Sequence, residues 1–157
     1  MAHKKKSSSN KEDEGFFRKH SLSFTVAAVL IALVLLYRGA DEKTHIGSFF
    51  GNAIADWTGF LVVVLGTKHM YEKGSAESRQ PPHPLFRVIP EAIRDHSLTI
   101  FLVATGMVWV LVYLKLDSEA KWGEVVGNIV SEWTQILGTV LLTKKLTEAK
   151  SKESKKD

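Results

Sequence analysis

The chain is composed of two related halves. When residues 18–78 are shifted by 76 positions, they align with residues 94–154 without a gap. Identical pairs include His20/His96, Ser21/Ser97, Tyr37/Tyr113, Gly47/Gly123, Gly51/Gly127, Asn52/Asn128, Trp57/Trp133, Lys68/Lys144 and Glu72/Glu148. A duplicated unit places its equivalent positions around a common axis. We therefore expect function where Asn52 and Asp56 of the first half meet Asn128 and Glu132 of the second.

Each half contains two long apolar runs, at residues 21–37 and 46–67 and at residues 97–114 and 122–143. The first and third runs contain no charged residue, and the second contains only Asp56. A helix crosses a bilayer with about 20 apolar residues. A soluble four-helix bundle would show a polar face on every helix, which the first and third runs lack. The sequence therefore predicts an all-α membrane protein with four transmembrane helices.

The same runs define the domain organisation. We expect two helical-hairpin repeats of parallel topology, at residues 14–78 and 90–154, because each hairpin crosses twice and returns the chain to one side. Residues 79–89 are predicted to form a cytoplasmic linker, and Pro90 to begin a short helix. Residues 1–13 are predicted to be a disordered basic tail, and residues 155–157 a second tail. The second and fourth long helices should be central.

Basic residues predict the orientation. Of the 21 Lys and Arg residues, 17 lie before the first run, between the hairpins or after the last run, and four lie in the hairpin loops. This positive-inside distribution predicts that both termini are cytoplasmic, in a bacterial cytoplasmic membrane. It also explains the net charge of +4 through anionic lipid headgroups. The lipid bilayer is thus the expected partner, and nucleic acid is not.

The second and fourth runs each carry polar residues on one half of a helical wheel. Asn52/Asp56 and Asn128/Glu132 are pairs four residues apart, and Ser131 and Gln135 share the polar half. The two acids lie ten residues from the outer end, about 15 Å deep, where a charge is costly and suggests function. We expect a proton or cation site built from these six residues. The alternative is that the same side chains only hold the helices together by hydrogen bonds.

Glycines repeat beside the polar residues. Gly47-x-x-x-Gly51 and Gly123-x-x-x-Gly127 are small-xxx-small motifs, which predict close helix packing. The helical wheel places these glycines on the polar half. It assigns the opposite half, including Ile129, Trp133 and Val140, to lipid.

His20 and His96 occupy equivalent positions before the first and third helices. They are candidates for a cytoplasmic proton relay, or for a metal site with Glu72 and Glu148, although a hydrated interfacial role is the alternative. Ser21 and Ser97 are predicted to be helix N-caps. The chain has no cysteine, phosphate loop or HExxH motif, so we expect no enzyme activity and no cofactor, and any metal is undetermined.

Three short motifs together resemble an uncharacterised bacterial membrane family of two-helix units. They are His-Ser-Leu at residues 20–22 and 96–98, Asn128-x-x-Ser131-Glu132-x-x-Gln135, and Gly-Ser-Ala-Glu-Ser at residues 74–78. The first half departs from the family pattern, with Asp56 in place of Glu and Gly59 in place of Gln. The resemblance implies the duplicated hairpin architecture and no particular activity.

Two functions remain open from the sequence. The first is a small proton or cation channel or transporter that uses Asp56 and Glu132. The second is a structural membrane subunit whose polar stripe packs internally or against a partner, either another copy of the chain or a different membrane protein. A membrane enzyme is the weakest reading, because no catalytic constellation is present.

Overall fold

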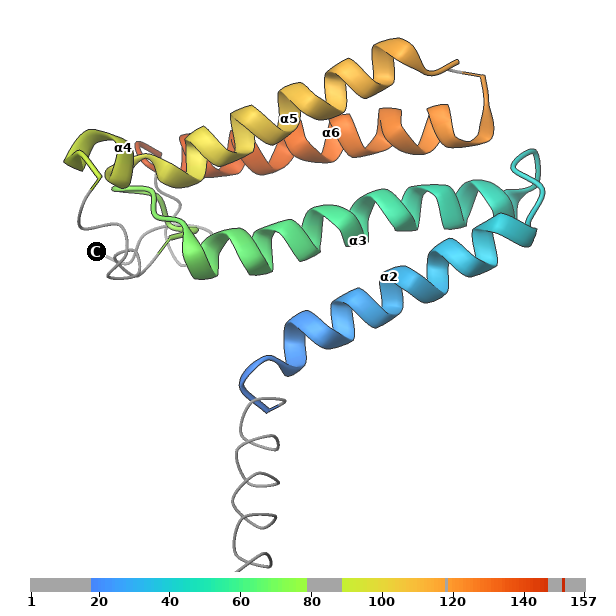
Figure 1. Cartoon of the computed structure of the whole chain (residues 1–157), viewed down its shortest axis with the longest axis horizontal. Helices are drawn as coiled ribbons and strands as arrows, with labels where there is room; N and C mark the ends of the chain where they lie inside the picture. Colours follow the sequence, from blue (N-terminus) through green and yellow to red (C-terminus); the bar gives the residue numbers. More distant parts are fainter. Residues whose placement is uncertain (1–17, 79–88, 118, 147–150, 152–157) are drawn as a thin grey trace, which may run out of the picture.

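The computed structural model describes residues 18–78, 89–117, 119–146 and 151. Within these residues the chain forms five helices and no strand: α2 (Ser21–Gly39), α3 (His45–His69), α4 (Glu91–Asp95), α5 (Ser97–Lys115) and α6 (Lys121–Leu142) (Figure 1). Four of them, α2, α3, α5 and α6, are long and apolar enough to cross a membrane. The prediction of an all-α chain with four such helices is confirmed.

The long helices form two neighbouring hairpins. α2 packs along α3 and α5 along α6, while α3 packs against α6, so α3 and α6 are central as expected. The turns after α2 and α5 lie at one end, which we call the loop end (right in Figure 1). α4 and the segment after α3 lie at the opposite end, which we call the linker end (Figure 1).

Hydropathy predicted the helix bounds to within two residues. The short helix also appears, since α4 begins after its N-cap residue Pro90. The predicted tails at residues 1–13 and 155–157, and all but one residue of the predicted linker 79–89, lie outside the described residues. Their disorder stays a prediction.

The two predicted N-cap serines do not cap their helices. Ser21 and Ser97 are the first helical residues, and the cap positions are His20 and His96, without a side-chain capping bond. The hydroxyl of Ser97 instead donates to the carbonyl of Tyr71, at 3.1 Å, and accepts from the amide of Tyr71, at 2.8 Å. This serine holds the segment after α3 against the start of α5.

Three residues of α6 that were assigned to lipid are buried by α5 and by the first hairpin. Trp133 is only 5% exposed. Its Nε1 donates to Thr105 Oγ1 of α5 at 2.9 Å, and its ring meets Trp109 edge-on. Ile129 and Val140 are also buried. The lipid assignment was wrong for these residues because a helical wheel shows which side is apolar but not which neighbour covers it.

The glycines of the two motifs pack against tyrosine rings. A Cβ on Gly51 would lie 3.4 Å from the ring of Tyr37, and one on Gly127 would lie 3.0 Å from the ring of Tyr113. A Cβ on Gly47 would meet the backbone of Asp41 in the preceding turn. These three glycines therefore close each hairpin onto itself, whereas the helical wheel had grouped them with the polar residues. Gly123 is buried as well.

Candidate functional site

Two asparagines join the central helices. Asn128 Nδ2 of α6 donates a hydrogen bond to Asn52 Oδ1 of α3 at 2.6 Å. Asn128 is half-buried and Asn52 is exposed. The structure thus brings together the two equivalent amides, and their bond fixes the relative height of α3 and α6.

The two acids lie one turn further toward the linker end. The carboxyls of Asp56 and Glu132 are close enough to interact electrostatically. Glu132 is half-buried, with its Oε2 only 3.4 Å from where a Cβ on Gly59 would lie. The absence of a side chain at Gly59 therefore makes room for Glu132, while Asp56 remains exposed.

A cavity of about 190 Å³ begins beside Glu132 and extends to the linker end. Its polar lining residues are Glu132, Gln135 and Thr139 of α6, Thr67 of α3 and Glu77 from the segment after α3. The rest of the lining is apolar and comes from α3, α5 and α6. One carboxyl from the middle of the helices and one from the linker end therefore line the same cavity.

The polar lining follows one row along α6. Glu124, Asn128, Glu132, Gln135 and Thr139 succeed one another at intervals of three or four residues, so they share a helix face. Gln135 joins the cavity, but Ser131 does not line it and is exposed on α6. Of the six expected site residues, Glu132 and Gln135 thus line the cavity, Asp56 interacts with Glu132, and Asn52 and Asn128 bond to each other one turn away.

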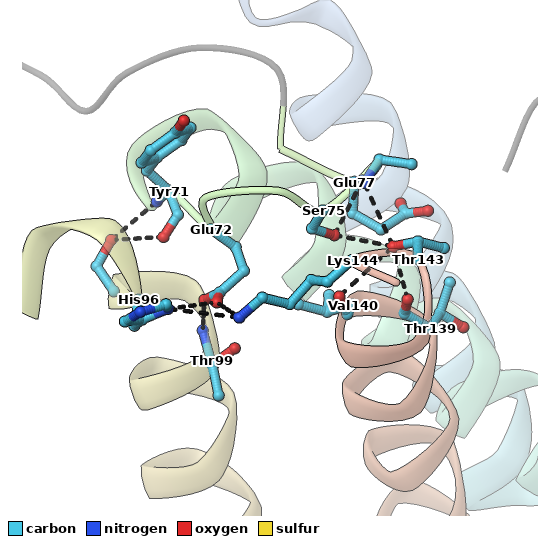
Figure 2. A network of polar contacts seen from close by, with 12 residues as sticks. Tyr71, Glu72, Ser75, Glu77, His96, Thr99, Thr139, Val140, Thr143 and Lys144 are labelled. Atoms are coloured by element: carbon cyan, nitrogen blue, oxygen red, sulfur yellow. Dashed lines mark hydrogen bonds and ion pairs between the residues drawn. The ribbon is translucent and has the colours of Figure 1, made fainter. Parts of the chain in front are cut away.

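A second polar cluster closes the linker end (Figure 2). Glu72, which is fully buried, accepts hydrogen bonds from Lys144 Nζ at 2.5 Å and from the backbone amide of Thr99 at 3.1 Å, and contacts His96 Nδ1 at 2.7 Å. Its partners lie at the start of α5 and after the end of α6. We call Glu72, His96, Thr99 and Lys144 the clasp, because a single acid from the first hairpin holds both helices of the second.

The clasp favours the charged form of its acid. Burial alone would raise the pKa of Glu72, but the hydrogen bonds from Lys144, His96 and Thr99 outweigh burial and hold the pKa below its ordinary value. Glu72 is therefore a carboxylate near neutral pH. A carboxylate that is fully buried and bonded to a cation is expected to stabilise the fold as long as every partner is present.

A hydroxyl pair lies beside the clasp. Ser75 Oγ and Thr143 Oγ1 are 3.0 Å apart, and the amide of Ala76 donates to the same Thr143 oxygen at 3.3 Å (Figure 2). These bonds tie the Gly-Ser-Ala-Glu-Ser segment to the end of α6. They also hold Glu77, the next residue, beside the linker end of the cavity.

The two histidines lie in separate polar contacts. His20 Nδ1 is 2.7 Å from Lys68 Nζ, whereas His96 belongs to the clasp. Neither histidine lines the cavity. Glu148, the second acid of the possible metal site, lies outside the described residues, within which no group of three metal-binding side chains occurs.

Sequence reasoning missed Glu77 and Thr139 as cavity residues and Lys144 as a clasp residue. Thr139 could have been found, because it continues the spacing of the polar row on α6. The position of Glu77 at the cavity depends on how the chain turns back after α3. Glu77 lies outside the helices, so no helical periodicity could have predicted this position.

No family model, no curated protein and no solved structure matches this chain. The family resemblance suggested by the short motifs therefore stays a prediction. The case for function comes from the geometry of the site.

Proposed function

We propose that this integral membrane protein conducts protons or small cations, with Asp56 and Glu132 as the central site. The observation that carries the proposal is that two interacting carboxyls in the middle of the helices adjoin a cavity leading to a third carboxyl, Glu77, at the linker end. Acidic residues within membrane helices mark proton and ion pathways. The polar residues along α6 would carry the proton or cation between the mid-helix carboxyls and Glu77.

The chemistry of the site suits protons best. Two neighbouring carboxyls repel each other when both are ionised, so one of them is expected to hold a proton, and such a pair gains and loses its protons in coupled steps. The amide oxygen of Asn52, which could otherwise bind a cation, already accepts a hydrogen bond from Asn128. Asp56, which is exposed, would exchange protons with Glu132, and hydroxyl and amide groups of the cavity would relay them to Glu77.

Flux through purified protein in liposomes tests the proposal. We expect the full-length protein to dissipate a pH gradient, and both Glu132→Gln and Asp56→Asn to abolish this flux by removing the exchangeable proton. The control variant is Glu119→Gln, an exposed acid in the turn before α6, which should conduct normally. Flux no greater than in empty liposomes would reject conduction, and full flux in Glu132→Gln would reject the site.

A structural role is the second candidate, and one observation favours it. Asn52, Asp56, Ser131 and Gln135 are all exposed although they lie within the apolar helices. Such residues commonly hydrogen-bond to another helix, for about 0.6–2 kcal/mol each. In that case the same two variants would weaken assembly by about this amount, and the wild-type protein would carry no flux.

We infer that the two hairpins are parallel repeats. Three observations support this inference: α2 and α5 have the same length 76 positions apart, each hairpin packs a tyrosine ring on an equivalent glycine, and a His–Lys contact recurs as His20–Lys68 and His96–Lys144.

We also propose that the linker end faces the cytoplasm of a bacterial cell, because basic residues gather there. A membrane-impermeant thiol reagent applied to intact cells should label Glu119→Cys and spare Lys145→Cys. The reverse labelling would invert the orientation.

A further inference from the structure

The contact between the hairpins uses different sides of the two central helices. A Cβ on Gly59 of α3 would lie 3.2 Å from Ile136 Cδ1 and 3.4 Å from Glu132 Oε2 of α6. A Cβ on Gly66 would lie 3.3 Å from Leu98 of α5. The glycine side of α3 therefore lies against both helices of the second hairpin.

Each residue of this contact has an equivalent residue in the other half of the chain, and these equivalent residues do not make the same contact. Gly59 corresponds to Gln135, Ile136 to Phe60 and Glu132 to Asp56. If a twofold axis related the hairpins, Gln135 would lie against Phe60 and Asp56 in the same chain. Instead Gln135 and Asp56 are exposed, and Phe60 is 45% exposed. Apart from the pairs Asn52–Asn128 and Asp56–Glu132, the two hairpins therefore contribute unlike residues to their contact.

The same asymmetry occurs at the loop end. Tyr37 is 1% exposed because its hydroxyl donates to the carbonyl of Lys121 at 2.8 Å and its ring meets Trp122. Its equivalent Tyr113 is 36% exposed, and Ile46, the equivalent of Trp122, is 66% exposed. The second tyrosine is thus without the contact that buries the first.

The linker end repeats the pattern. Leu98, which packs at Gly66, is 2% exposed. The equivalent pair is Leu22 and Leu142, which are 55% and 58% exposed. The middle of the helices, the loop end and the linker end therefore each leave residues without this contact on the second hairpin and on the first hairpin.

We propose that a second copy of the chain covers these residues, with the exposed Gln135, Tyr113 and Leu142 of the second hairpin from one copy packed on the first hairpin of the next. Gln135, Tyr113 and Leu142 of one copy would contact Phe60, Ile46 and Leu22 of its neighbour, as their equivalents do within the chain. A head-to-tail interface of this kind forms a ring if it closes and an open row if it does not.

The side chains at the middle level fit this occupant. Within the chain, the long Glu132 lies against a glycine; between copies, the shorter Asp56 would face the longer Gln135, so the total volume is similar. The Gln135 amide can donate to the Asp56 carboxyl. An exposed acid and amide in the hydrocarbon region would otherwise face lipid, which is costly. This argument depends on the proposed membrane span but not on conduction.

Cysteine cross-linking in membranes tests the proposal, and the chain has no cysteine of its own. Copies carrying Gln135→Cys, co-expressed with copies carrying Phe60→Cys, should form a disulfide-linked species of twice the monomer mass. The double variant should form a ladder of multiples or a closed ring. The matched control is the equivalent pair Ile31→Cys and Met107→Cys, which are 61% and 62% exposed and face away from the contact; it should remain monomeric.

A second cysteine pair keeps the proposal testable if the Gln135→Cys variant does not fold. Tyr113→Cys with Ile46→Cys, at the loop end, should also link neighbouring copies. Absence of linked species in both pairs would overturn the proposal and leave lipid or another protein as the cover. Linking of Gln135→Cys to itself would also overturn it, because that outcome requires a symmetric contact. If the copies are cross-linked but the protein carries no flux, the proposal of conduction is rejected and the proposal that copies assemble is supported.

Discussion

The clasp and the mid-helix site both join the two hairpins through an acid, but they differ in how completely that acid is satisfied. Glu72 is fully buried and has a cation, a histidine and a backbone amide as partners. Asp56 is exposed and interacts with a second acid, Glu132, beside a cavity. The clasp resembles a completed structural contact. The mid-helix site has no such complete set of partners, which is why we propose it as the site of proton exchange.

The comparison predicts that removing the clasp acid causes the largest loss of stability. Glu72→Ala should lower the free energy of unfolding by about 3 kcal/mol, because it leaves Lys144 and His96 without their acceptor. This is the low end for buried pairs, since the side chains of Lys144 and His96 both reach water. Denaturation in detergent measures it, with the exposed acid of Glu91→Ala as the control that should change stability by less than about 1 kcal/mol. A loss as small as in that control would mean the clasp is no stronger than a surface pair.

Hairpin closure should be the next most sensitive feature. Gly127→Leu should cost about 2 kcal/mol, because its Cβ would already crowd the Tyr113 ring and further atoms must displace it. Gly51→Leu should cost less, since the Tyr37 ring is 3.4 Å away rather than 3.0 Å. Thermal unfolding of both variants checks the order. Gly39→Leu, where no atom lies within 4 Å of the added Cβ, serves as the control. Equal stability in all three variants would contradict the tyrosine packing.

Acid should weaken the clasp in a defined direction. The folded pKa of Glu72 lies below its unfolded value, so its contribution to stability is complete above the unfolded pKa of about 4.3 and is lost as the pH falls through the lower folded value. Melting temperature should therefore drop below about pH 4. Glu72→Gln should reduce this drop. An unchanged acid profile in that variant would assign the effect to other carboxylates.

The smallest effect on stability is expected at the mid-helix site. Glu132→Gln should change the free energy of unfolding by less than about 1 kcal/mol, because the amide can still hydrogen-bond and a half-buried acid is removed. The same unfolding experiment as for Glu72→Ala measures it. A loss as large as at Glu72 would make Glu132 a second clasp and remove the contrast between the two sites.

Much of the fold follows from hydropathy alone, because each long helix is an apolar run bounded by charged or turn-forming residues. The meeting of Asn52 and Asn128 was also predictable, since the duplication gives them equivalent positions. Which side of α6 faces the neighbouring helices was not predictable. Trp57 and Trp133 are identical in the two halves, but only Trp133 faces a hydroxyl, because Thr105 is replaced by Val29 in the other half. Packing between hairpins depends on such differences, which periodicity does not contain.

The clasp also has a consequence for biosynthesis. Glu72 and Lys144 are separated by 72 positions, and the acid is made first. At about 5–20 residues per second, the ribosome needs about 4–14 s to reach the lysine. The helices of the first hairpin have already been made during that interval. The Glu72 carboxylate lacks His96 for the first part of it and lacks Lys144 for all of it. The order of synthesis therefore leaves Glu72 without Lys144 until α6 has been made, so the clasp can close only after the helices of both hairpins have been synthesised.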